Sequence, residues 1–189
     1  MIIQRNIASA ILAHLCLTVA AAENTALRMG AGSYLGNGHL AYVFAEQGVR
    51  TLHLMKITGG EPQRLFSKQI DMSSGAPILV AGAVVLVDTA GKMLKLDYSG
   101  KVLFDGALPN FTGASKFSGR LDSSRIYVEN TFGGKNQDGI GHQVWIVDVS
   151  KDEPVVLQKH STGQFVKTFV SYPDTLYLFG LDGVEKVKF

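Results

Sequence analysis

Short segments in which apolar and polar positions alternate follow one another along most of the chain, separated by clusters of Gly, Asn, Asp, Ser and Pro. Residues 125–130 and 143–149 show the pattern most clearly, because both are rich in β-branched and aromatic side chains. Each segment is too short for an ordinary helix and is bounded by turn residues, which is typical of β-strands. The pattern predicts an all-β protein.

The predicted strands fall into four antiparallel meanders. They are expected at 39–44, 49–57 and 64–67; at 78–80, 83–88, 93–98 and 102–105; from near Phe117 through 125–130, 143–149 and 155–159; and at 165–172, 175–179 and 184–189. A short strand at 25–29 and a loop at 31–38 precede them. The last meander has about three strands, and an exposed edge invites aggregation. We therefore expect the strand at 25–29 to pair there and complete the ring.

Three of these segments form a degenerate repeat. Residues 54–60, 94–100 and 145–151 each run from an apolar strand into a turn and occupy corresponding places in the first three meanders. A repeat of about 40–45 residues that holds four strands is the period of a propeller blade. Each meander has an apolar face that it cannot bury alone, and stacking neighbours around an axis buries such faces.

The turns of the repeat resemble those of a known class of proteins. The segments VDTAGK (87–92), LDYSGK (96–101) and WIVDVSK (145–151) place an Asp at the end of an apolar strand. In this respect the chain resembles the irregular β-propeller repeats of the WD40, YVTN and quinoprotein type. It lacks the Gly-His to Trp-Asp signature of WD40 blades, and its four units are fewer than those families normally use. The resemblance implies a small or incomplete β-propeller, and a β-sandwich built from the same strands is the alternative.

The first 22 residues have the features of a signal peptide. Arg5 supplies a positive charge, residues 7–19 an apolar core, and residues 20–22 a small-residue cleavage site. The sequence therefore predicts a periplasmic or secreted protein whose mature part, 23–189, is a single domain without a membrane span. Cys16 is the only cysteine and lies within the signal, so the mature chain would have neither disulfides nor a thiolate nucleophile.

Charge and motif spacing narrow the classes of function. The formal net charge is +2, and the Lys and Arg residues are interleaved with acids, so no nucleic-acid-binding stripe is predicted. No two histidines have metal-site spacing, and no serine lies in a recognised nucleophile motif. Asp88, Asp97 and Asp148 lie at strand ends, where Asp commonly caps backbone groups. We predict no catalytic residue, metal site or cofactor.

Two polar segments with an aromatic anchor are the candidate contact sites, although either could be simply a long solvated connection. One is the loop 131–142, which is longer than a hairpin needs. The other is the segment 108–116. Aromatic anchors among adaptable polar groups are typical of binding loops. The candidate residues are Phe132, Lys135, Asn136, Gln137, Asp138 and His142 in the first segment, and Asn110, Phe111 and Ser115 in the second.

The sequence favours an exported, non-enzymatic protein that binds a protein partner through loops. Among exported β-meander proteins of this size, one class that the chain looks like is the immunity proteins, which insert a polar loop into the cleft of a cell-wall-degrading effector. The resemblance implies a secreted cell-wall hydrolase as the partner. One alternative is a propeller-type enzyme or enzyme subunit, quinoprotein-like or lyase-like, which predicts acidic and His side chains from different meanders in close contact. Another alternative is an envelope scaffold protein.

Overall fold

The computed structural model describes residues 28–35, 38–57, 61–73, 75–115, 117–132, 141–162, 166–172, 174–180 and 182–189. All regular structure in these ranges is β-strand. The described part of the chain contains no helix long and apolar enough to cross a membrane. The all-β prediction is therefore confirmed.

The strands form four antiparallel sheets, each made of strands that are consecutive in the chain. Sheet A contains β1 (Arg28–Leu35), β2 (His39–Glu46), β3 (Val49–Lys56) and β4 (Gln63–Ile70). Sheet B contains β5 (Ile78–Val80), β6 (Ala83–Val87), β7 (Lys92–Asp97) and β8 (Val102–Ala107). Sheet C contains β9 (Ser118–Arg120), β10 (Arg125–Phe132), β11 (Gly141–Asp148) and β12 (Val155–Thr162), and sheet D contains β13 (Val166–Tyr172), β14 (Thr175–Gly180) and β15 (Val184–Lys188).

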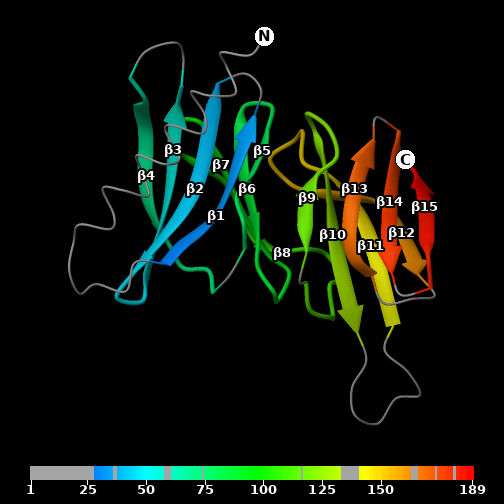
Figure 1. The fold of residues 1–189 in the computed structure, drawn as a ribbon. Coiled ribbons are helices and arrows are strands. Elements are labelled where there is room, and N and C mark those ends of the chain that lie inside the picture. The colour runs from blue at the N-terminus through cyan, green and yellow to red at the C-terminus, as the bar shows by residue number, and fades with distance from the viewer. Residues whose placement is uncertain are drawn as a thin grey trace.

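The four sheets follow one another in chain order across the molecule, and this series of sheets is called the arch below (Figure 1). The first strands of successive sheets lie closest together, since β1 and β2 contact β5, and β5 contacts β9. The later strands of each sheet extend outward, as in the blades of a propeller. The fold is therefore a small, open, propeller-like arrangement of four meanders, as predicted.

Apolar clusters between neighbouring sheets hold the arch together. One cluster joins sheets A and B, a second joins B and C, and a third joins C and D. Strand β6 illustrates the pattern, because all five of its residues are buried. Val84 and Leu86 pack toward sheet A, whereas Val85 and Val87 pack toward sheet C. A strand covered on both faces becomes a continuous apolar run, which is why residues 83–87 do not alternate.

One irregularity recurs in the outermost strands of sheets A, B and C. Between consecutive register pairs, the outer strand contains one extra residue, which is Leu65 in β4, Leu103 in β8 and Leu157 in β12. Such a β-bulge bends a strand and protects an edge from further pairing. The residue after the bulge is Phe66, Phe104 or Gln158. The recurrence supports the sequence repeat at 54–60, 94–100 and 145–151, whose segments form or follow the third strand of each sheet.

Aspartates fix the turns of this repeat. Asp88 accepts hydrogen bonds from the backbone N–H groups of Ala90 and Lys92, and Asp97 from those of Ser99 and Lys101. Asp148 accepts one from the N–H of Ser150. The predicted capping role of these three aspartates is confirmed. Their geometry is that of Asx turns, in which a carboxylate replaces a backbone acceptor.

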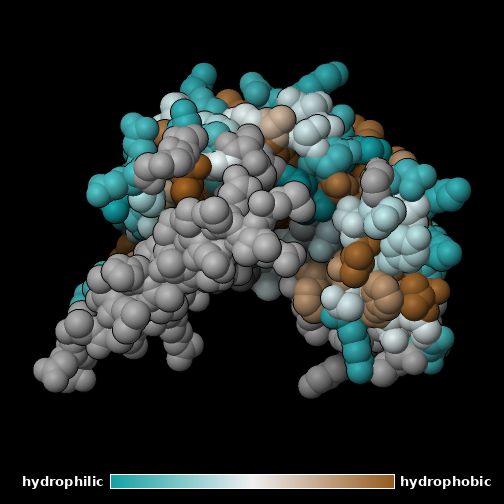
Figure 2. All heavy atoms as spheres, turned by 45° about the horizontal axis from the view of Figure 1, so that its top comes forward, coloured by the Kyte–Doolittle hydropathy of each residue, from teal (hydrophilic) through white to brown (hydrophobic). Residues whose placement is uncertain are grey.

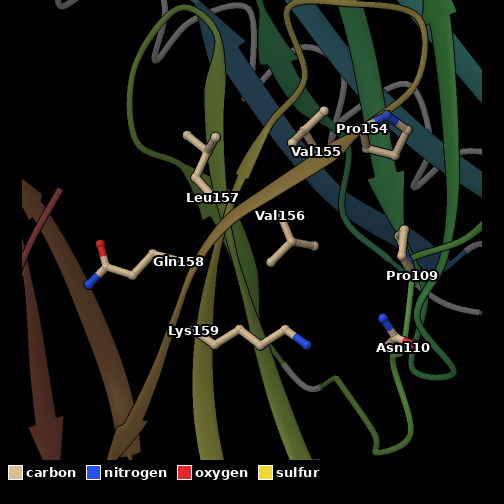
Figure 3. Close-up of a pocket in the computed structure, with 8 residues that line it drawn as sticks. All are labelled: Pro109, Asn110, Pro154, Val155, Val156, Leu157, Gln158 and Lys159. Atoms are coloured by element: carbon tan, nitrogen blue, oxygen red, sulfur yellow. The ribbon is translucent and has the colours of Figure 1, made fainter.

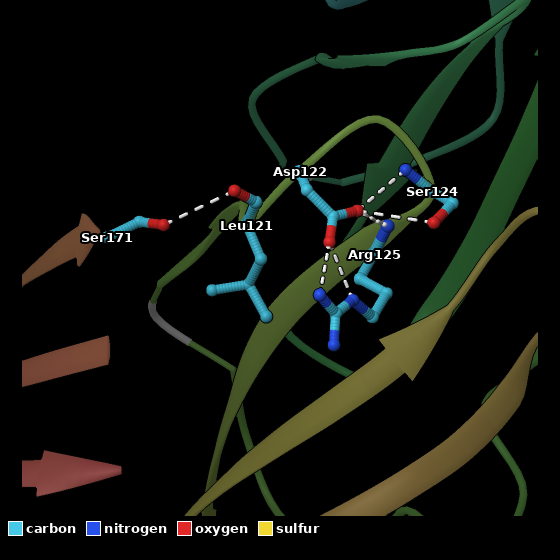
Figure 4. Close-up of polar contacts among 5 residues, drawn as sticks. All are labelled: Leu121, Asp122, Ser124, Arg125 and Ser171. Carbon is cyan, nitrogen blue, oxygen red and sulfur yellow. Dashed lines mark hydrogen bonds and ion pairs between the residues drawn. The ribbon is translucent and has the colours of Figure 1, made fainter. Parts of the chain in front are cut away.

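The turn at residues 121–124 contacts three sheets. Asp122 accepts hydrogen bonds from the N–H groups of Ser124 and Arg125, both at 2.8 Å, and its other oxygen pairs with the Arg125 guanidinium (Figure 4). From sheet B, the N–H of Ala81 donates to the Ser123 carbonyl. From sheet D, the hydroxyl of Ser171 donates to the Leu121 carbonyl at 3.3 Å. This one turn therefore ties sheets B and D to sheet C.

The start of the chain corrects two predictions. Residues 28–35 form a strand where a loop was expected at 31–38, because β1 pairs with β2 across a register shift between Met29 and Gly32. The same pairing shows that the expected closure is wrong, since the N-terminal strand belongs to sheet A and not to sheet D. Sheet D keeps three strands, and the arch stays open. The predicted signal peptide lies outside the described residues.

Candidate functional site

Strand β12 is an edge strand with exposed apolar side chains. It is the outermost strand of sheet C, and no described strand pairs with its other edge. Val155 is 49% exposed and Leu157 is 53% exposed. An edge strand presents unpaired N–H and C=O groups, and this one adds apolar side chains to them. Free backbone groups and apolar contact area therefore occur together at this edge.

The three-stranded sheet D explains why Leu157 is exposed. Leu65 and Leu103 occupy the same bulge in sheets A and B, and both are half-buried against the apolar cluster formed with the next sheet. Sheets B and C, which follow them, each have four strands, whereas sheet D has no described fourth strand. Leu157 therefore has no outer strand to cover it.

A groove runs along β12, and Val155 and Leu157 are among the residues that line it (Figure 3). Val156 and Lys159 form one side, and Pro109 and Asn110 form the opposite side, with Pro154 at one end. The groove is open, with a volume of about 390 Å³. It separates the outer edge of sheet C from the turn that follows the last strand of sheet B. The exposed side chains of Val155 and Leu157 therefore border an open groove.

Phe111 fixes the far wall of the groove from inside. Its ring packs edge-on against Trp145, with 5.4 Å between ring centroids, and lies directly against Gly91. The adjacent Asn110 has a φ of +59°, a left-handed conformation that Asn tolerates better than most residues. The N–H of Phe111 closes the turn on the carbonyl of Leu108. Phe111 is thus a core anchor that positions Pro109 and Asn110.

The β12 side of the groove carries a positive charge over an aromatic ring. The Nζ of Lys159 lies 4.0 Å from the centroid of the Trp145 ring. Trp145 is 1% exposed, and its Nε1–H donates to Gln143 at 2.9 Å. A cation over an indole is attracted by the ring quadrupole. This contact holds the Lys159 side chain along the groove.

The segment 131–142 is partly strand. Thr131 and Phe132 end β10, Gly141 and His142 begin β11, and these residues pair with one another. Lys135, Asn136, Gln137 and Asp138 lie outside the described residues, so their predicted role stays a prediction. His142 is buried, with its Nδ1 3.2 Å from the Thr131 hydroxyl and 4.0 Å from a carboxylate oxygen of Glu129. Glu129 is itself 1% exposed.

The sequence reasoning located part of the groove and missed the rest. Asn110 lines it, whereas Ser115 is buried and donates to the Phe117 carbonyl. Val155 and Leu157 were not predicted. The signal that could have found them is the apolar run that starts at Val155 directly after a turn, followed by a meander with one strand fewer than the others.

One acid–histidine pair joins two sheets. Nε2 of His160 in β12 lies 2.7 Å from a carboxylate oxygen of Glu185 in β15, and both side chains are partly exposed. The enzyme alternative predicts acidic and His side chains from different meanders in close contact, and this pair, which joins the outer strands of two sheets, is one such contact. No group of three or more His, Cys, Asp or Glu side chains within the described ranges is arranged to hold a metal ion.

Comparison with known proteins supports the fold class. No protein-family model matches the chain, and no curated protein sequence matches it. Among solved structures, the chain is similar to the computationally designed Ika4 protein, with 16% identity, a TM-score of 0.59, and coverage of 89% of this chain and 95% of that one. It is also similar to BBS1N, solved in complex with ARL6DN, with 12% identity, a TM-score of 0.55, and coverage of 84% and 49%.

A third similar structure is an acylaminoacyl peptidase from Pyrococcus horikoshii, with 12% identity and a TM-score of 0.55. The match covers 85% of this chain and 32% of the peptidase, so the chain spans about half of BBS1N and about a third of the peptidase. BBS1N and the matched part of the peptidase are propeller-like. At these identities the matches show the fold alone, which is propeller-like.

Proposed function

We propose that this protein is a binding module that takes up an extended segment of a partner polypeptide along the free edge of β12. The observation that carries the proposal is the coincidence of three features on one strand. These are an unpaired edge, exposed apolar side chains at Val155 and Leu157, and an open groove that these side chains help to line. Strand addition to a sheet edge is a recurring mode of peptide recognition.

The geometry matches what an added strand requires. Successive side chains of a strand point to opposite faces. Some side chains of the partner would enter the groove between Lys159 and Asn110. Others would cover the exposed side chains of Val155 and Leu157. The backbone hydrogen bonds give affinity in such a complex, and the side-chain contacts give specificity.

The bulge at Leu157 limits how long the paired segment is. It interrupts the even spacing of free N–H and C=O groups, so pairing along the whole strand is disfavoured. A short partner segment that pairs with β12 on one side of the bulge satisfies this restriction. The bulge also discourages uncontrolled pairing between copies of this edge.

A secreted cell-wall hydrolase is the partner class that we propose to test first. The basis is the resemblance of the exported β-meander chain to immunity proteins, together with the predicted signal peptide. In this version of the proposal the β12 edge, and not only the loop 131–142, contacts the hydrolase. A periplasmic or secreted location is part of the same proposal.

Selection of peptides displayed on phage tests the binding mode without a known partner. The immobilised protein is the target, and its Leu157→Lys variant is the counter-target. We expect selected peptides to alternate apolar and polar residues and to bind the variant at least about 30-fold more weakly, the effect of losing a hot-spot contact. The matched control is Val102→Lys, because Val102 is a similarly exposed edge residue outside the groove.

The control should bind the selected peptides like the unsubstituted protein. Equal binding by the Leu157→Lys variant would contradict the proposed site. Measuring the far-ultraviolet circular dichroism of both variants separates a lost contact from a lost fold. Binding of a purified cell-wall hydrolase encoded beside this gene tests the partner class, and absence of binding would reject that class while leaving the peptide result to decide the site.

A further inference from the structure

The free face of sheet D is apolar and exposed. Val170 is 49% exposed, Tyr172 67% and Val184 54%. Register places Tyr177 beside Val170 and Phe179 beside Val184 on this face, because cross-strand partners point to the same side of a sheet. Apolar side chains gather at this end of the arch (Figure 2). Contiguous apolar patches of this kind mark interaction sites.

The free face of sheet A, at the other end of the arch, carries a row of apolar side chains along β2. Leu40, Tyr42 and Phe44 point away from sheet B, since Ala41 and Val43 of the same strand lie in the A–B cluster. Met55 is the register partner of Leu40 and extends this face. Polar side chains share the face: the Tyr42 ring stacks on its register partner His53, with 4.8 Å between centroids, and Thr51 is the partner of Phe44.

The free faces of sheets A and D point in opposite directions along the series of sheets. Within the arch, the C-side face of sheet B packs against sheet C, and the D-side face of sheet C packs against sheet D. In the same progression, sheet D offers a face to a following sheet, and sheet A offers a face to a preceding one. Within the described residues, no apolar cluster joins sheet A to sheet D. The progression is therefore incomplete at both ends.

We propose that a second copy of this chain completes the ring. The free face of sheet D of each copy packs against the free face of sheet A of the other, and a two-fold axis relates the copies. Propellers are typically closed by four to eight blades, and two copies of four sheets reach the upper value.

The area available is sufficient for a stable pair. One face of a sheet of three strands, about 4.8 Å apart and about six residues long, has an area of roughly 300 Å². A closed two-copy ring buries four such faces at once, or roughly 1,200 Å², which is the lower end of the range for specific interfaces. Lys186 and Lys188 lie on the same face of the edge strand β15. Their flexible stems allow the ammonium groups to stay in solvent at the rim.

The mass of the purified, exported protein in solution tests the proposal. Light scattering coupled to size exclusion should give twice the single-chain mass, and Val170→Lys should reduce it to one chain. Val102→Lys is again the control, because this exposed residue lies on neither free face, and it should remain a pair. A single chain at all concentrations, larger open polymers, or a Val170→Lys variant that still pairs would overturn the proposal.

Cross-linking between mixed copies tests which faces meet. Copies carrying Val170→Cys are mixed with copies carrying Met55→Cys and treated with a short bis-maleimide. Cross-links should form between the two variants and not between identical copies, because sheet D faces sheet A in the proposed ring. Cross-links between two Val170→Cys copies would overturn it. Neither face includes Leu157, so failure here and failure of the β12 binding site are separate results.

Discussion

At the scale of single residues, Gly91 leaves the space in which the Phe111 ring packs, and Phe111 positions the wall of the groove. It has a φ of +76°, and a Cβ at this position would overlap the Phe111 ring. We expect Gly91→Ala to lower the free energy of unfolding by about 2–4 kcal/mol, the sum of a conformational cost and an overpacking cost. Urea denaturation followed by Trp145 fluorescence measures this loss.

Gly82→Ala is the matched control for this substitution. Gly82 has a φ of +72°, but nothing lies within 4 Å of the position that a Cβ would take. Gly82→Ala should therefore lower the free energy of unfolding by the conformational cost alone, about 1 kcal/mol. Equal losses in the two variants would show that Phe111 does not depend on Gly91 for its place.

The candidate site residues show what local sequence can and cannot reveal. Phe111 and His142 stand among polar residues, as binding residues do, yet Phe111 packs on Trp145 and His142 lies beside Glu129. A single aromatic or His in a polar segment looks the same whether its side chain turns inward or outward. The contacts that decide its direction come from strands far away in the chain. Only Asn110 could be placed correctly at the groove.

At the scale of elements, the turn at residues 121–124 bonds sheets B and D to sheet C, and we expect the free energy of unfolding to depend on it. Burial of the Asp122 carboxyl acts to raise its pKa, but hydrogen bonds from Ser124 and Arg125 and the charge of Arg125 outweigh it, so the pKa lies below its ordinary value. A carboxyl whose folded pKa is lowered stabilises the fold above its unfolded pKa. This stabilisation is lost as the pH falls through the folded value.

Asp122→Asn should therefore lower the free energy of unfolding by about 1–2 kcal/mol at neutral pH. The difference from the unsubstituted protein should shrink as the pH falls below about 4, the ordinary value for Asp. Urea denaturation across this pH range measures both. Asp97→Asn is the comparison, since Asp97 caps an exposed turn within sheet B, and we expect a smaller loss. A difference that grows toward low pH would contradict the account.

Most elements could be predicted from the sequence, and the exceptions share a cause. Strands β6, β7, β10 and β11 lie within two residues of the predicted bounds, because their apolar runs end in Asp and Gly turns. Strand β1 was missed because Gly30, Ala31, Gly32 and Ser33 have low strand propensity. Its pairing with β2 overrides that propensity. Closure failed for the same reason, since the choice of partner strand is not a local property.

At the scale of the whole molecule, the three apolar clusters are unequal. Within the described residues, the A–B and B–C clusters each contain 12 buried residues, and the C–D cluster contains 7. In an array whose units contact only their neighbours, stability is close to a sum of unit and interface terms. Sheet D, with three strands and the smallest interface, should therefore open most easily.

Hydrogen exchange measured by mass spectrometry tests this order. In the Val170→Lys variant, whose pairing between copies is expected to be lost, the amides of β13–β15 should exchange through openings of lower free energy than those of β6 and β7. Sheet A, at the other end of the arch but with four strands and a larger cluster, should be intermediate. Uniform exchange across all four sheets would show instead that the arch unfolds as one cooperative unit.

The contact between Lys159 and Trp145 has a practical consequence. Trp145 is the only tryptophan of the chain, so all indole fluorescence comes from a ring that lies beneath Lys159 at one side of the groove. The emission of an indole responds to a nearby charge, and an occupant of the groove has to share space with that ammonium group. The protein therefore carries its own optical probe at its candidate binding surface, and titrations need no added label.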